Sequence, residues 1–112
     1  MSQITTHILD TTIGKPAAGI TIVLYRGEND EWAELKRGKT KDDGRINDLL
    51  AKDVLLQIGI YKLRFETKDY FDKIQTPTFY PFVEITFDIQ SSEHYHIPLL
   101  LNPFGYTTYR GS

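Results

Sequence analysis

Residues able to do chemistry gather near the end of the sequence. The chain closes on Tyr109, Arg110, Gly111 and Ser112, which place a cation, a hydroxyl and an α-carboxylate within four residues of one another. His94 and His96 lie shortly upstream. Chain ends are usually frayed and polar, whereas this one is reached through a strand-like run. If the tail is ordered, it therefore carries the functional groups of a small-molecule active site.

His96 is predicted to point away from the protein core. Side chains alternate between the two faces of a strand, so His94–Leu101 presents a core face made of Tyr95, Ile97, Leu99 and Leu101. The opposite face carries His94, His96, Pro98 and Leu100. Such a mixed face is more typical of an interface or a cleft wall than of a solvated surface. The alternative, a surface histidine without function, is left open by this strand alone.

Three further candidates each have an ordinary alternative. His7 lies within a predicted strand, Ile4–Asp10, where a partly buried structural histidine is the usual case. Arg45 follows the Asp43-Gly44 pair, which predicts a tight turn, and a turn cation is normally solvated. At the tail, Arg110 is most simply a salt-bridge former.

A metal site is not expected. His94 and His96, two residues apart on one strand, could share a metal ion, but no carboxylate is obviously near them in the sequence. The chain has no cysteine and no glycine-rich nucleotide loop. We therefore predict that the protein uses no metal and no organic cofactor.

Length and charge restrict the class of protein. The 112 residues form one domain, residues 1–112, long enough to bury a core. Thirteen basic and fifteen acidic residues give a net charge of −2, which favours neither nucleic acid nor an anionic membrane as partner. No signal peptide is visible, and no apolar run approaches the ~20 residues that span a bilayer. A soluble, cytoplasmic protein is expected.

The hydropathy pattern predicts an all-β fold. Alternation is clear in Phe82–Ile89 and Tyr61–Glu66, and further strands are predicted at 20–26 and 32–40. One short helix is expected at Lys68–Ile74. Residues 48–58 fit neither the period of a helix nor that of a strand. Seven to eight short strands with frequent turns predict an antiparallel β-sandwich.

Three segments together resemble a known family. Thr6–Ala17 (THILDTTIGKPA) is similar to the N-terminal signature of the 5-hydroxyisourate hydrolases, the enzyme branch of the transthyretin family. Asp43–Arg45 resembles the second signature, and His94–Ser112 resembles the third, including the terminal Tyr-Arg-Gly-Ser that distinguishes the enzymes from the hormone carriers. The likeness runs the length of the chain, with small departures such as Asn102, where serine is common.

The resemblance implies a transthyretin-like sandwich assembled as a homotetramer, a dimer of dimers, with sites in the cleft between dimers. It implies hydrolysis of 5-hydroxyisourate, a small molecule of urate (purine) catabolism, to 2-oxo-4-hydroxy-4-carboxy-5-ureidoimidazoline. The catalytic residues would be His7, Arg45, His96 and Ser112, with Tyr109, Arg110 and Gly111 anchoring the tail and binding substrate. One alternative is a transthyretin-like carrier of a small apolar or aromatic ligand, and another is a structural sandwich domain without a ligand.

Overall fold

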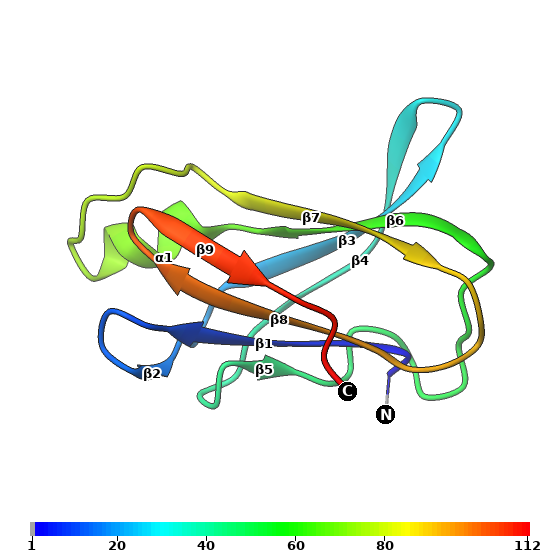
Figure 1. Ribbon diagram of the computed structural model, residues 1–112, viewed down its shortest axis with the longest axis horizontal. Coiled ribbons are helices and arrows are strands. Elements are labelled where there is room, and N and C mark those ends of the chain that lie inside the picture. The colour runs from blue at the N-terminus through cyan, green and yellow to red at the C-terminus, as the bar shows by residue number, and fades with distance from the viewer. Residues whose placement is uncertain (1) are drawn as a thin grey trace.

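The computed structural model describes residues 2–112 as two β-sheets packed face to face with one short helix (Figure 1). The first sheet has the order β2 (Lys15–Pro16), β1 (Ile4–Asp10), β8 (Tyr95–Asn102) and β9 (Gly105–Thr108), and β5 (Arg45–Ile46) also pairs with β1. The second sheet has the order β4 (Glu31–Lys39), β3 (Thr21–Glu28), β6 (Gly59–Phe65) and β7 (Val83–Ile89). Apart from the two-residue β2 and β5, the strands match the predicted number. The predicted β-sandwich is thereby confirmed.

One strand pair departs from the predicted antiparallel arrangement. β1 and β8 run parallel, with Thr5 opposite His96 and His7 opposite Pro98. A parallel pair needs a long crossover between its strands, and here the crossover contains the whole second sheet and the helix. As a result, residues from the two ends of the chain lie side by side in the middle of the first sheet (Figure 1).

The core fills the space between the sheets and comes from the inward faces that alternation predicts. Tyr61, Leu63 and Phe65 of β6 are fully buried. On β8, the predicted core face is buried throughout: Tyr95, Ile97, Leu99 and Leu101. Burying each such side chain contributes about 1.5–3 kcal/mol of hydrophobic stabilisation. The opposite face of the first sheet is therefore left for a site.

The helix α1 (Thr67–Lys73) lies where one was predicted and is fixed to the first sheet. Phe71 is buried, and the Tyr70 hydroxyl donates to Oδ2 of Asp10 on β1 at 2.8 Å. Burial, and then the Asp10 carboxylate, raise the pKa of Tyr70 above its usual value. No helix within residues 2–112 is long and apolar enough to cross a membrane.

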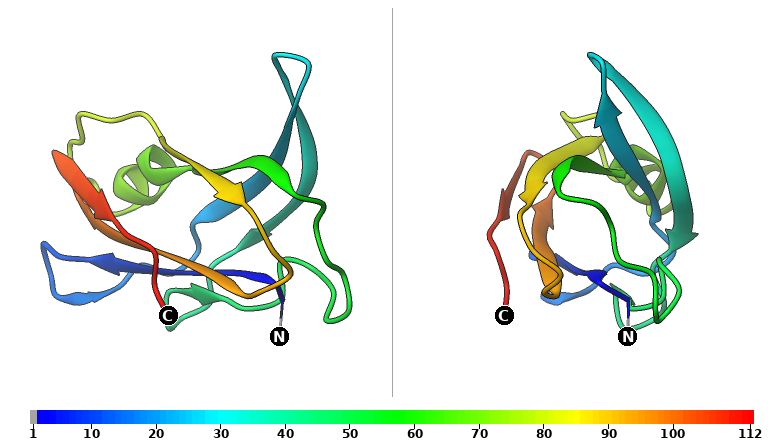
Figure 2. Two further views of the ribbon diagram at one scale, coloured as in Figure 1. Left: turned by 45° about the vertical axis from the view of Figure 1, so that its right-hand side comes forward. Right: turned by 90° about the vertical axis from the view of Figure 1, so that its right-hand side faces the viewer.

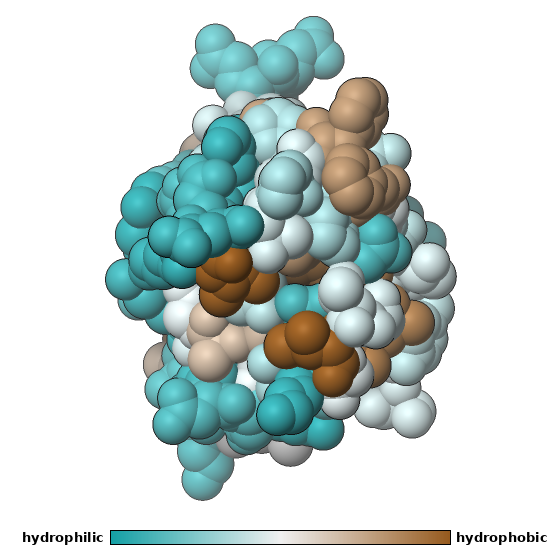
Figure 3. Space-filling model, turned by 90° about the vertical axis from the view of Figure 1, so that its left-hand side faces the viewer, coloured by the Kyte–Doolittle hydropathy of each residue, from teal (hydrophilic) through white to brown (hydrophobic). Residues whose placement is uncertain are grey.

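The end of the molecule that bears α1 shows separate apolar spots on a largely polar surface (Figure 3). Exposed apolar side chains from its turns and loops include Ile13, Ile74, Phe79 and Phe104. Because these spots are separated by polar residues, the view gives no continuous docking surface there.

Candidate active site on the outer face of the first sheet

Strand register brings the predicted site residues together. β5 pairs with β1 so that Arg45 lies opposite His7, and β8 pairs with β1 so that His96 lies opposite Thr5. Side chains of opposite residues point to the same face of a sheet, and Thr5 and His7 share a face because they are two residues apart. His7, Arg45 and His96 therefore lie on one face, the outer face of the first sheet.

The tail returns to this face after a break caused by proline. Beyond β9, Gly111 forms an isolated bridge with His96, and its N–H donates to the His96 carbonyl oxygen at 2.8 Å. Hydrogen-bonded pairs recur at every second residue of an antiparallel ladder, so the next pair would be Pro98 with Tyr109. Proline has no N–H to donate, and the Pro98 carbonyl instead accepts the Thr108 hydroxyl at 2.7 Å. The chain runs outside β8 to its end (Figure 2).

Close packing against His96 explains glycine at position 111. A β-carbon there would lie 2.6 Å from Cδ2 of His96 and 3.2 Å from Cγ of Pro98, and the first distance is shorter than real contacts allow. Pro98, predicted to lie on the outer face with His96, is buried, and a β-carbon at position 111 would touch its ring. The tail of the same chain thus packs closely beside His96 and Pro98.

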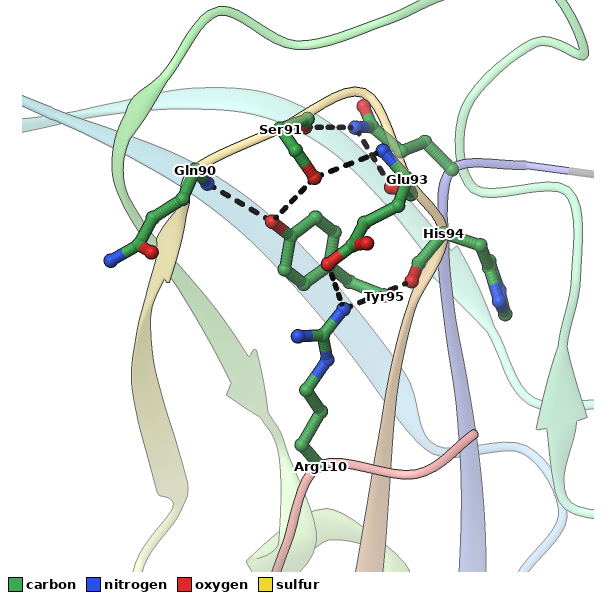
Figure 4. Close-up of polar contacts among 7 residues, drawn as sticks. Gln90, Ser91, Glu93, His94, Tyr95 and Arg110 are labelled. Atoms are coloured by element: carbon green, nitrogen blue, oxygen red, sulfur yellow. Dashed lines mark hydrogen bonds and ion pairs between the residues drawn. The ribbon is translucent and has the colours of Figure 1, made fainter.

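Arg110 fixes the tail on the inter-sheet side of β8 (Figure 4). Its Nη2 pairs with Oε1 of Glu93 at 2.7 Å, and its guanidinium lies 4.4 Å from the centre of the Tyr95 ring. The pairing holds the pKa of the Glu93 carboxyl below its usual range. The His94 ring points away from Arg110 (Figure 4), and its Nε2 lies near the Thr5 hydroxyl. Tyr109 is 57% exposed and Ser112 is exposed, so the contacts that hold the tail come from Arg110 and Gly111.

Thr5, which no sequence pattern singled out, joins two of the histidines. Oγ1 of Thr5 lies 2.8 Å from Nε2 of His94 and 2.7 Å from Nδ1 of His96. The signal that could have found it is its position two residues before His7, on the same face of β1. With this hydroxyl between the facing nitrogens, the two histidines do not converge on an open metal position. No group of three or more His, Asp or Glu side chains within residues 2–112 could hold a metal ion, and independence from a cofactor remains a prediction.

The environment favours the neutral form of both candidate bases. Burial, and then the charge of Arg45, lower the pKa of His7, while Asp43 acts in the opposite direction. Burial also lowers the pKa of His96, followed by the charges of His94, Arg45 and His7, while a hydrogen bond to the Thr5 backbone opposes them. At neutral pH both imidazoles are therefore poised to accept a proton rather than to carry one.

A groove of about 650 Å³ lies on the inter-sheet side of the tail, away from the two histidines. It is lined by residues of β7, β8 and the tail, including Phe87, Tyr95 and Arg110. His7, Arg45 and His96 are not among its lining residues. The outer face remains the candidate site despite this hollow, because it holds both imidazoles and an arginine.

Two neutral imidazoles, one guanidinium and an ordered chain end suit acyl-group hydrolysis. A neutral imidazole can remove a proton from water, and the resulting imidazolium can return it to a leaving group. A guanidinium can stabilise a developing oxyanion and bind a planar, carbonyl-rich ring. Such a set of groups can hydrolyse a small polar molecule without a nucleophilic side chain.

Comparisons with known proteins identify the family of the chain. The family model described as HIUase/Transthyretin family matches residues 4–111. A probable 5-hydroxyisourate hydrolase of Caenorhabditis elegans is 41% identical, over 99% of this chain and 82% of that protein. The 5-hydroxyisourate hydrolase of Mesorhizobium japonicum is 43% identical, over 98% of this chain and 92% of that protein.

Solved structures give the same result for the backbone. Sea bream transthyretin in complex with thyroxine superposes with a TM-score of 0.91 at 29% identity, over 98% of this chain and 95% of that one. The 5-hydroxyisourate hydrolase of Klebsiella pneumoniae superposes with a TM-score of 0.86 at 37% identity, over 97% and 98% of the two chains. The chain belongs to the HIUase/Transthyretin family.

Proposed function

We propose that this protein hydrolyses 5-hydroxyisourate to 2-oxo-4-hydroxy-4-carboxy-5-ureidoimidazoline, a step in the breakdown of urate. The observation that carries the proposal is the gathering of His7, Arg45 and His96 on one sheet face, with the tail bridged to His96. Relatives that are 41–43% identical over nearly the whole chain bear the name of this hydrolase, which supports the same substrate here.

In the proposed reaction, water adds to a ring carbonyl and the ring C–N bond breaks. One of the two histidines takes the proton from the attacking water, and the departing nitrogen receives a proton from an imidazolium. Arg45 binds the planar ring and stabilises the oxyanion. Ser112 positions water or substrate through its hydroxyl or its carboxylate.

The backbone alone does not separate an enzyme from a carrier. The thyroxine complex of sea bream transthyretin is as similar in fold as the hydrolase structure is, and this likeness supports carriage of a small ligand as the second candidate. The site residues favour hydrolysis, because a carrier channel needs neither two neutral imidazoles nor a chain end packed on one of them.

We further propose a homotetramer, a dimer of dimers, with sites where dimers meet. Two features support assembly: the edge strands β7 and β9 have a partner on only one side within residues 2–112, and the outer face near His96 carries half-buried Leu100. Unpaired edges are templates for pairing with another chain. Light scattering should give four times the 12.9 kDa chain mass, and a monomer at micromolar concentration would contradict the assembly.

The test of function is the ultraviolet absorbance of freshly generated 5-hydroxyisourate, followed with and without the protein. The proposal predicts that the protein accelerates decay and that His96→Ala abolishes most of the acceleration. Decay at the uncatalysed rate, together with saturable binding of an aromatic ligand, would favour the carrier.

A further inference from the structure

The Thr5 hydroxyl makes its hydrogen bonds with two histidine rings. It lies 2.8 Å from Nε2 of His94 and 2.7 Å from Nδ1 of His96. Thr5 is only 2% exposed, so bulk water does not compete for these contacts. The two rings flank it with centroids 6.3 Å apart and an angle of 24° between their planes. The three side chains therefore form one hydrogen-bonded unit.

The number of protons in this unit is limited. A hydroxyl has one proton to donate and two lone pairs that accept. If both facing nitrogens lacked a proton, only one of them could receive the hydroxyl proton, and the other would face a lone pair. At least one of Nε2 of His94 and Nδ1 of His96 must therefore carry a proton.

Whether Nε2 of His94 carries a proton then determines which nitrogen of His96 carries one. When Nε2 of His94 accepts the Thr5 proton, Nδ1 of His96 must donate to the hydroxyl. Nε2 of His96 then holds a lone pair and can accept a proton from water. When Nε2 of His94 carries a proton, the hydroxyl can donate to Nδ1 of His96, and Nε2 becomes the donor.

We propose that Thr5 is a positioning residue for His96 and that, through its hydroxyl, His94 sets which nitrogen of His96 carries the proton. The proposal rests on the function proposed above. In it, Thr5 and His94 touch no substrate, and both act by presenting Nε2 of His96 in the form that the reaction step requires. Orientation of a catalytic imidazole by a third group at its other nitrogen is a general device.

The neighbouring threonine shows what an ordinary structural role looks like. Thr6 is 1% exposed, on the opposite face of β1, and its hydroxyl donates to the main-chain carbonyl of Ile97. It has the same burial and the same strand as Thr5, but its partner belongs to the backbone. Thr6→Val is therefore a matched control for the loss of one buried hydroxyl from β1.

The experiment compares wild type, Thr5→Val, Thr5→Ser and Thr6→Val as full chains. Long-range ¹H–¹⁵N spectra at about pH 8, above the usual histidine pKa of ~6.5, report the protonation of Nδ1 and Nε2 of His96. Turnover of 5-hydroxyisourate gives kcat and KM. We expect Thr5→Val to move both His96 nitrogen shifts and to lower kcat roughly 10–100-fold, the range found when partners that orient histidine ligands are removed, with KM little changed. Thr5→Ser should behave like wild type.

Each outcome decides the proposal. His96 nitrogen shifts in Thr5→Val equal to those of wild type would overturn it, and so would equal losses of kcat in Thr5→Val and Thr6→Val. If Thr5→Val does not fold, His94→Phe replaces it, because phenylalanine keeps a ring but offers no nitrogen; unchanged His96 shifts there would also overturn the link. If wild type does not hydrolyse 5-hydroxyisourate, the proposed function fails, while the spectra still decide whether Thr5 joins the rings.

Discussion

Gly111 lies against the imidazole of His96. Its N–H donates to the His96 carbonyl oxygen at 2.8 Å, and a β-carbon at position 111 would come within 2.6 Å of Cδ2 of the ring. The chain end and the candidate base are therefore placed relative to each other by a main-chain hydrogen bond and by steric fit. Any larger residue at 111 must move one of the two.

Gly111→Ala should lower kcat by about 10²-fold, the cost of roughly 1 Å of misplacement in a catalytic constellation. The expected cause is displacement of Ser112 from the site, with the fold retained. The matched control is Gly105→Ala in β9, because a β-carbon there meets Asn102 at an ordinary 3.7 Å. Equal turnover in both variants would show that the tail need not lie against His96.

His7→Ala and His96→Ala should each keep the circular dichroism spectrum of wild type and lose about 10²–10⁴-fold in kcat, as general acid–base groups do. Both side chains lie outside the sandwich core, so their loss leaves the packing between the sheets intact. A folded variant that turns over 5-hydroxyisourate at the wild-type rate would remove that histidine from the mechanism.

The pH profile should reflect two histidines whose pKa values lie below the usual 6.5. Activity that needs a neutral imidazole should persist as the pH falls to 6.5 and decline only at lower pH. Between each folded pKa and 6.5 the unfolded chain binds more protons, so the free energy of unfolding should decrease as the pH falls through this window. NMR titration of the histidine C–H signals measures the pKa values directly.

Substitutions of Arg45 test the cause of the lowered pKa values of His7 and His96. Its charge lowers the pKa of His7 and of His96, so Arg45→Met should raise both pKa values, and Arg45→Lys should largely preserve them. Titration of His7 and His96 at or above 6.5 in the wild-type protein would contradict the environment described here.

The Glu93–Arg110 ion pair should matter for turnover and not for stability. Both side chains are more than half exposed, so Glu93→Gln is expected to leave the melting temperature unchanged while loosening the tail and lowering kcat severalfold. Asp72→Asn removes a similarly exposed pair with Lys68 on α1, far from the tail in sequence, and should leave kcat unchanged. A similar kcat in the two variants would mean that the pair does not hold the tail.

The parts of the fold that the sequence predicts are those where one period extends over many residues. Alternation over Phe82–Ile89 and His94–Leu101 predicts strands and their buried faces, because eight residues in each range show a period of two. β2 and β5 have two residues each, too few to show any period. The segment 48–58 contains buried Leu49 and Leu50 as well as exposed Val54 and Leu55. Because of that mixture, its apolar residues follow neither the helical period nor the strand period.

The members of the candidate site were predictable apart from Thr5, but their geometry was not. His96 was expected to point outward because its neighbours on β8 alternate. Arg45 appeared as a turn cation, since only the pairing of β5 with β1 places it opposite His7. The parallel pairing that sets Thr5 beside His96 joins residues 91 apart in sequence, and no local pattern reports such a contact.

The most direct test of the account is the rate of 5-hydroxyisourate decay with the full chain and with a chain that ends at Thr108. Removing residues 109–112 leaves the strands and the core intact, so circular dichroism and particle size should not change. The account predicts rapid catalysed decay with the full chain and little above the uncatalysed rate with the shortened one. Equal catalysed rates would show that the tail is no part of the site, and the absence of catalysis by the full chain would contradict the proposed hydrolase.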